Sequence, residues 1–131
     1  GLARQGAYVV VNDLPQQLPA LGETVEVIES LGSRALPAPA DVSDHEAVRA
    51  MFDEARTVFG GIDIVVSNAA YNCRQPVVDA DLHQVRRVIE VNQYGLFHVC
   101  QTAARHMVER SIQLLLVGSS GCSLYRILQS Q

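Results

Sequence analysis

The stretch Gly61-Ile62-Asp63-Ile64-Val65-Val66-Ser67-Asn68-Ala69-Ala70 decides the fold of this chain. It is a β-branched apolar run that stops at small polar residues and precedes a long helical pattern. A run that is apolar on both faces predicts a central parallel strand, buried on each side by helices. Residues 67–70 are then expected beyond the carboxyl end of that strand, where open α/β sheets bind ligands, and their small side chains let a ligand approach the backbone.

Strands and helices are expected to alternate around this stretch. The apolar runs predict strands over 8–11, 34–40, 62–66 and 112–117, and the helical periodicity predicts helices over 16–31, 43–59 and 81–110. A helix end over 2–5, closed by Gly6, precedes the first strand. Prolines within 34–40 remove ladder donors and indicate an edge strand. The alternation predicts a single domain over 1–131 with a parallel sheet, right-handed crossovers and helices on both faces.

Two of the helices have specific local signals. Ser43 and Glu46 form a capping box, in which Ser43 caps the N3 amide and Glu46 reaches back, and Gly60-Gly61 ends the helix after Phe59. In the last helix the expected buried stripe consists of Leu82, Val85, Val88, Ile89, Asn92, Leu96, Val99, Cys100, Ala103 and Met107.

Charge and hydropathy exclude several classes of partner. The chain has 131 residues, 48% of them hydrophobic and 18% charged, which is ordinary for a soluble globular protein. A net charge of −4 argues against nucleic acid or an anionic membrane as a partner, because no basic stripe is present to neutralise phosphates. No apolar run approaches the roughly 20 residues needed to span a bilayer, and no signal peptide opens the sequence.

Cysteine, histidine and arginine usage narrows the chemistry. Cys73, Cys100 and Cys122 are odd in number and lack metal-ligand spacing, which indicates reduced thiols and the cytoplasm as the default location. The four histidines all fall on expected helices without the spacing of a metal site, so we expect no metal. All ten basic residues are arginines, and the chain therefore offers no lysine chemistry.

Carboxylates end the first two expected strands. Asp13 occupies the place where a dinucleotide-binding fold puts a carboxylate that accepts hydrogen bonds from the adenosine ribose, although a solvated turn aspartate would look the same. Asp41 ends the next strand and equally suits the entry to a helix.

Polar residues also mark the second half of the chain. Asn92 is an amide inside an apolar stripe, and burying it without partners would cost about 1–3 kcal/mol, so it must be hydrogen-bonded. It is either a core asparagine that holds neighbouring backbone or an active-site residue. Ser119 and Ser120 follow the last strand at the same edge as Asn68, and a hydroxyl there either bonds a substrate oxygen or belongs to an ordinary turn.

Five segments taken together resemble the short-chain dehydrogenase/reductase family. They occur in order at plausible spacing over most of the chain: 9–13, 41–42, 61–70, 91–95 and 114–119. The resemblance implies an incomplete Rossmann-like doubly wound parallel sheet with three α/β/α layers. It implies an NAD(P)-dependent oxidoreductase that interconverts an alcohol and a carbonyl of a small molecule by hydride transfer. The whole protein would be a homo-oligomer.

By the same resemblance, Asp13 accepts the adenosine ribose and favours NAD over NADP, because its charge repels the extra phosphate. Asp41 and Val42 flank the adenine. Asn68-Ala69-Ala70 matches the family's Asn-Ala-Gly, with alanine in place of the usual glycine.

The two catalytic positions that the resemblance assigns are Asn92 and Ser119. Asn92 is the helix asparagine of the catalytic tetrad, which holds a water in the proton relay. Ser119 orients the hydroxyl or carbonyl oxygen of the substrate.

Two parts of the family pattern are missing from the sequence. The glycine-rich turn would precede Gly1, and the Tyr-x-x-x-Lys pair is expected just past Gln131; Tyr125 is too close to Ser119 and is followed by Gln129. We therefore expect an internal piece of a longer reductase that lacks the middle strand, folds poorly and is inactive alone. The alternative is a non-catalytic nucleotide-binding or interaction module. A receiver-type domain is disfavoured because the chain has no lysine.

Overall fold

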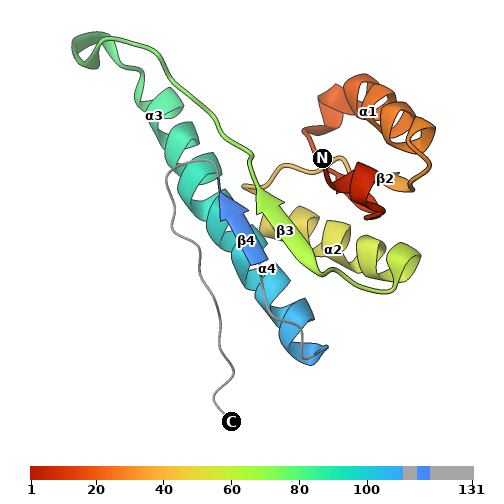
Figure 1. The fold of residues 1–131 in the computed structure, drawn as a ribbon. Helices are drawn as coiled ribbons and strands as arrows, with labels where there is room; N and C mark the ends of the chain where they lie inside the picture. Colours follow the sequence, from red (N-terminus) through yellow and green to blue (C-terminus); the bar gives the residue numbers. More distant parts are fainter. Residues whose placement is uncertain (111–114, 119–131) are drawn as a thin grey trace.

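The computed structural model describes residues 1–110 and 115–118 of the chain. Strands alternate with helices, as predicted (Figure 1). The strands are β1 (Val9–Val11), β2 (Ala35–Pro37), β3 (Ile64–Ser67) and β4 (Leu115–Gly118). The α-helices are α1 (Leu18–Ser30), α2 (His45–Phe59), α3 (Leu82–Ile89) and α4 (Leu96–Glu109). The 3-10 turns are η1 (Leu2–Gln5), η2 (Pro15–Gln17) and η3 (Val77–Asp79), and η4 (Glu90–Gly95) is π-helical.

The described strands form two parallel pairs rather than one continuous sheet. β1 pairs with β2, Val10 opposite Leu36, and β3 pairs with β4, Val65 opposite Leu116. Among the described residues β2 pairs only with β1, and each of the other strands likewise has a single partner. β1 and β3 do not pair with each other, and in the dinucleotide-binding order 3-2-1-4-5-6 this is where strand 1 would run. The fold is an incomplete Rossmann-like α/β sheet.

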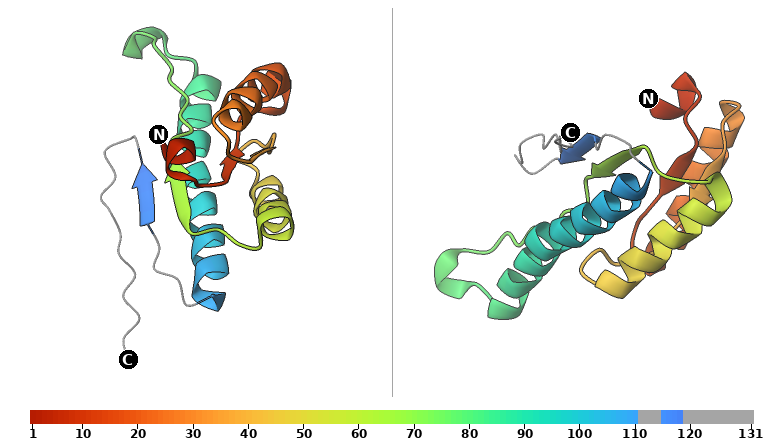
Figure 2. Two further views of the ribbon diagram at one scale, coloured as in Figure 1. Left: turned by 45° about the vertical axis from the view of Figure 1, so that its right-hand side comes forward. Right: turned by 90° about the horizontal axis from the view of Figure 1, so that it is seen from below.

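The core lies between helices α2 and α4 and the strand β3. α2 packs against α4, α4 packs against β3, and α2 and α4 run side by side in Figure 2. The buried cluster consists of Val42, Val48, Phe52, Val65, Val91, Val99, Ala103 and Met107. Separately, α1 packs on β1 and β2 and buries Leu21 and Ile28.

The prediction that the central strand is buried on both faces is wrong for the described chain. Val65 is 8% exposed, whereas Ile64 is 43% and Val66 is 51% exposed. Side chains alternate along a strand, so Val65 faces the core and its two neighbours face the opposite side. The described helices α2 and α4 cover only the first of these faces.

The buried stripe predicted for residues 81–110 is also wrong in its first half. Leu82 is 67% exposed, and Val85 and Ile89 are exposed as well. The line that is buried recurs every four residues: Val91, Gly95, Val99, Ala103 and Met107. Two physical reasons account for the difference. The α3 helix extends beyond the tips of β3 and β4 (Figure 1), and the π-helical η4 changes the angular phase between α3 and α4.

The capping box predicted from Ser43 and Glu46 does not form at the start of α2, because the next residue is the N-cap. Asp44 is the N-cap, and its carboxylate accepts hydrogen bonds from the backbone N–H groups of Glu46 at 2.9 Å and Ala47 at 3.2 Å. The Ser43 hydroxyl instead donates to Asp41 at 2.7 Å. The predicted end is confirmed, because Gly60 closes α2 with a left-handed φ of 81°.

Candidate functional site

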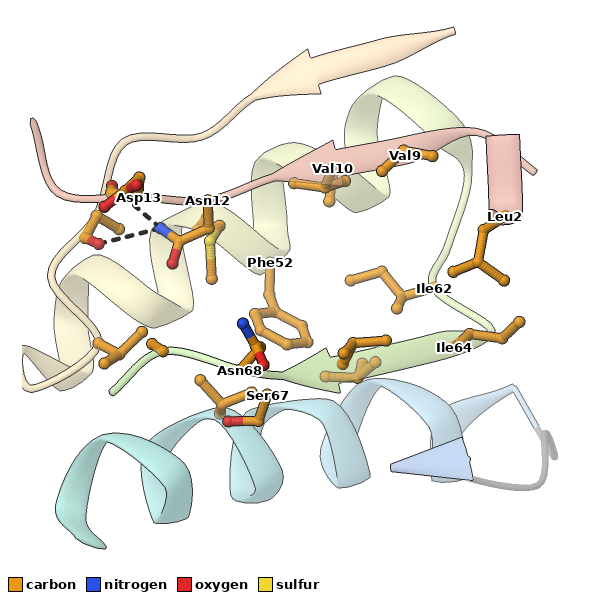
Figure 3. Close-up of a pocket in the computed structure, with 18 of the residues that line it drawn as sticks. Leu2, Val9, Val10, Asn12, Asp13, Phe52, Ile62, Ile64, Ser67 and Asn68 are labelled. Carbon is orange, nitrogen blue, oxygen red and sulfur yellow. Dashed lines mark hydrogen bonds between the residues drawn. The ribbon is translucent and has the colours of Figure 1, made fainter. Parts of the chain in front are cut away.

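A cleft of about 900 Å³ separates β1 from β3. Figure 3 shows Val9 and Val10 on one side of it, Ile62 and Ile64 on the other, and Phe52 of α2 between them. Asn12, Asp13, Ser67 and Asn68 lie toward the carboxyl ends of the two strands. The structure brings all of the predicted cofactor-binding residues to this one cleft: Asp13, Asp41, Val42, Asn68, Ala69 and Ala70.

The backbone of β1 is directed partly into the cleft. The N–H of Val9 donates to Arg34 O and the C=O of Val11 accepts from Ala38 N, each at 2.9 Å, toward the side of β2. Backbone groups of successive residues point to opposite edges of a strand, so those of Val10 point toward β3. In the described chain the cleft therefore combines two unpaired strand edges with a polar rim at their carboxyl ends.

Asp13 lies exposed at the end of β1, and its neighbour Asn12 fixes the backbone there. Asp13 Oδ1 accepts the N–H of Leu14 at 2.7 Å. Asn12 Nδ2 donates to Ala38 O at 2.8 Å and to Ala40 O at 3.0 Å, which ties the end of β1 to the segment after β2. Sequence reasoning assigned no such role to Asn12; the available signal was an amide directly after a β-branched run.

Asp41 and Val42 lie in the last part of the connection between β2 and α2, residues 41–44, which we call the 41–44 loop. Asp41 Oδ1 accepts from the amide and the hydroxyl of Ser43, at 2.9 and 2.7 Å. Its Oδ2 accepts from Arg87 Nη2 at 2.5 Å. Both Asp41 and Arg87 line the cleft. Sequence reasoning missed Arg87, because nothing in the sequence relates it to a carboxylate 46 residues away.

The ionisation of Asp41 follows from these contacts. Partial burial alone would raise the pKa of Asp41, but the hydrogen bonds from Ser43 and Arg87, with the charge of Arg87, hold the pKa below its ordinary value. A carboxyl whose pKa is lowered by folding stabilises the folded state above its unfolded pKa, and the contribution disappears as the pH falls through its folded pKa. The lowered pKa keeps the Asp41 carboxylate negatively charged at neutral pH.

Asn92 forms a two-point contact with the backbone of Tyr71. Its Oδ1 accepts the Tyr71 N–H at 2.8 Å, and its Nδ2 donates to Tyr71 O at 3.0 Å. The prediction that this amide must be hydrogen-bonded is confirmed. Tyr71 directly follows Asn68-Ala69-Ala70, and its hydroxyl donates to Gln84 of α3. Asn92 thus holds the end of the predicted cofactor segment without lining the cleft itself.

Ser119 lies outside the described residues, as does Ser120. In the sequence Ser119 directly follows Gly118, which is paired in register with Ser67 at the carboxyl ends of β4 and β3.

A pair of stacked histidines lies beside the 41–44 loop and was not predicted. The rings of His45 and His98 are 4.8 Å apart with an interplanar angle of 11°, and His98 Nδ1 lies 3.1 Å from Val42 O. Within residues 1–110 and 115–118 no three His, Cys, Asp or Glu side chains are grouped so that they could hold a metal ion. Among the helices of the same residues, none combines the length and apolar composition that crossing a bilayer requires.

Gly95 permits the close approach of η4 to the 41–44 loop. A Cβ atom built on Gly95 would lie 2.7 Å from Val42 Cγ2 and 3.3 Å from the Val42 carbonyl carbon. We expect Gly95→Ala to lower the free energy of unfolding by about 1–3 kcal/mol, since a well-packed contact must shift to admit the methyl group. Urea denaturation of the full-length protein measures this effect.

Gly22 provides the matched control for Gly95. It lies within α1, and a Cβ atom there would meet nothing within 4 Å. Gly22→Ala should raise the free energy of unfolding by about 0.5–1 kcal/mol, because alanine restricts the unfolded chain in a helix interior. Equal effects of the two substitutions would contradict the close contact at Val42.

The fold and the cleft together define an α/β protein with a cleft that extends to the carboxyl ends of its parallel strands. A family model described as "Enoyl-(Acyl carrier protein) reductase" matches residues 1–125. The 3beta-hydroxysteroid dehydrogenase 1 of Eggerthella lenta is 39% identical over 98 residues, 75% of this chain and 38% of the relative. A short-chain type dehydrogenase/reductase from Mycobacterium marinum superposes with a TM-score of 0.83 and 34% identity, over 88% of this chain and 45% of that chain. An NAD+-bound xylitol dehydrogenase superposes with a TM-score of 0.82 and 29% identity, over 89% of this chain and 44% of that chain.

This chain belongs to the short-chain dehydrogenase/reductase family of oxidoreductases, which confirms the resemblance of its five segments. It spans less than half the length of these relatives, from 38% to 45%. The relatives act on different substrates according to their names.

Proposed function

We propose that the full-length protein is an NAD(P)-dependent oxidoreductase that interconverts an alcohol and a carbonyl by hydride transfer. Residues 1–131 would form part of its single dinucleotide-binding domain. The observation that carries the proposal is the gathering of Asp13, Asp41, Val42 and Asn68 to Ala70 around one cleft, from three segments far apart in the sequence. A dinucleotide binds at the corresponding place in sheets of this topology.

The residues of the cleft fit the adenosine half of a nicotinamide dinucleotide. Asp13 is exposed at the end of β1 with a carboxylate that can accept two ribose hydroxyls, and the same charge opposes a 2′-phosphate. We therefore propose NAD as the preferred cofactor. The Asp41-Val42 backbone borders the adenine, and the small side chains of Ala69 and Ala70 leave room beside β3 for the rest of the cofactor.

The catalytic roles proposed for this chain are those of Asn92 and Ser119. The nicotinamide, when bound, supplies or accepts the hydride. Asn92 fixes the backbone at Tyr71, directly after the proposed cofactor segment Asn68-Ala69-Ala70, and would keep that segment in place beside the cofactor. Ser119 follows the end of β4 in the sequence and would donate a hydrogen bond to the substrate oxygen.

The proposed function also accounts for the cleft between β1 and β3, which do not pair with each other. Both strands run in the same direction as their partners and present apolar side chains and unpaired edges to the cleft. We propose that the full-length protein places a further parallel strand here. The turn at its carboxyl end would bring backbone N–H groups to the cofactor pyrophosphate.

Activity assays on the full-length protein test this function. Incubation with NAD and a panel of secondary alcohols, or with NADH and the matching ketones, should change the absorbance of reduced nicotinamide in proportion to enzyme. Saturable NADH binding without turnover of any alcohol or ketone in the panel would favour a non-catalytic nucleotide-binding module instead. Absence of both binding and turnover would contradict the proposal altogether.

A further inference from the structure

Arg87 joins the 41–44 loop to the helix that carries Asn92. Its Nη2 donates to Asp41 Oδ2 at 2.5 Å and its Nη1 donates to the Ser43 hydroxyl at 2.6 Å, so that the guanidinium forks across two groups of the loop. Glu90, on the same helical run, lies 3.7 Å from Nη1. The side chains of Asp41 and Arg87 are each 31% exposed, so solvent screens the pair only in part.

Further contacts along the same helical run hold the loop from the adjacent turns. Gly95 lies against Val42, and the ring of His98 lies beside the Val42 carbonyl. Val42 itself is 7% exposed and belongs to the hydrophobic core. The loop therefore rests on α3, η4 and α4 at several points, and Arg87 is its charged attachment.

The contacts of Asp41 also limit what its carboxylate can do. Oδ1 is occupied by the amide and hydroxyl of Ser43, and Oδ2 by Arg87. A ligand in the cleft therefore meets a carboxylate that is already engaged, while the backbone of Asp41 and Val42 runs beside it at a position that these bonds fix. A forked, charge-assisted contact of this kind restricts the orientation of both partners.

We propose that Arg87 is a positioning residue for the dinucleotide, which acts by fixing the backbone of Asp41 and Val42 along the adenosine end of the cleft. This inference rests on the proposed function. The hydrogen bonds of Arg87 go to the 41–44 loop, so its removal should weaken cofactor binding rather than slow the chemical step. The same anchor places the loop in a fixed relation to Asn92, which stands on the same helical run.

Arg86 gives a matched control. It is the preceding residue of α3, carries the same charge and is exposed, and the described residues give it no side-chain hydrogen bond or ion pair. Arg86→Met and Arg87→Met remove the same groups from the same helix, but only the second removes the contact with Asp41. Arg87→Lys keeps the charge and loses the fork, and Asp41→Asn weakens the pair from the other side without changing the helix.

The test measures NADH affinity by fluorescence, kcat and KM for NAD, and amide hydrogen exchange over residues 42–47, all on the full-length protein. Arg87→Met should weaken NADH binding about tenfold, as expected for loss of a charge-assisted hydrogen bond, and should speed exchange in the loop. KM for NAD should rise while kcat stays within about twofold, the pattern of lost ground-state binding. Asp41→Asn should act in the same direction, Arg87→Lys should act less, and Arg86→Met should have no effect.

The outcomes separate this inference from the function on which it rests. If wild type and Arg87→Met bind NADH equally, or if kcat falls while KM is unchanged, the positioning role is wrong. Should Arg87→Met fail to fold, Asp41→Asn provides the same comparison with the helix intact. Absence of NADH binding by the wild-type protein would overturn the proposed function, and the positioning role with it.

Discussion

Replacing Asn92 with alanine is expected to lower kcat of the full-length enzyme by about 100-fold, the effect that a displacement of roughly 1 Å in a catalytic arrangement produces. The amide of Asn92 holds both the N–H and the C=O of Tyr71, and no other described side chain bonds these groups. Without it, the backbone after Asn68-Ala69-Ala70 loses its attachment to η4. KM for NAD should change less than kcat, because the residues at the adenosine end of the cleft are untouched.

Asn72→Ala is the control for this substitution. Asn72 is exposed, adjacent to Tyr71 in sequence, and makes no side-chain hydrogen bond among the described residues. The kcat of the Asn72→Ala variant should stay within about threefold of wild type, since replacing an exposed side chain without partners changes stability little. Thermal melts of the Asn92→Ala and Asn72→Ala variants show whether both are folded at the assay temperature. A similar loss of kcat in the two variants, or none in Asn92→Ala, would contradict the role of the Asn92 contact.

The second large effect is expected at Asp13. Asp13→Asn should lower the ratio of kcat/KM for NAD to that for NADP by about 10- to 100-fold, because a charge-assisted hydrogen bond to the ribose is lost and repulsion of a 2′-phosphate is removed. Parallel steady-state kinetics with the two cofactors measure this ratio. Asp79→Asn, the same change at an exposed residue of η3, should leave the ratio unaltered. A wild-type enzyme that turned over better with NADP at equal concentration would show that the assignment of Asp13 is wrong.

Local patterns in the sequence were sufficient to predict the alternation of elements and to select residues that the structure brings to one cleft. Asp13, Asp41 and Asn68 each follow an expected strand, and parallel strands bring their carboxyl ends to one edge of a sheet. The prediction that β2 is an edge strand rests on an equally local reason, the loss of ladder donors at Pro37 and Pro39.

Features that depend on contacts between distant residues were not predictable. The Arg87–Asp41 pair joins residues 46 positions apart, and no periodicity marks either partner. The π-helical η4 changes the phase of a helix whose apolar spacing looked continuous, so Val91 and Gly95 are buried where the predicted stripe had Asn92 and Leu96. The exposure of Ile64 and Val66 likewise depends on which elements cover β3, and a strand's own sequence does not contain that information.

The central claim is that this chain supplies the adenosine side of a nicotinamide dinucleotide site that a further strand between β1 and β3 completes. The most direct measurement is a fluorescence titration of NADH into the full-length protein and into residues 1–131 alone, with a thermal melt of each. We expect the full-length protein to bind NADH saturably and to melt cooperatively, and we expect residues 1–131 to do neither. Saturable NADH binding and a sharp melt by residues 1–131 would contradict the need for the added strand, and absence of binding by the full-length protein would contradict the site itself.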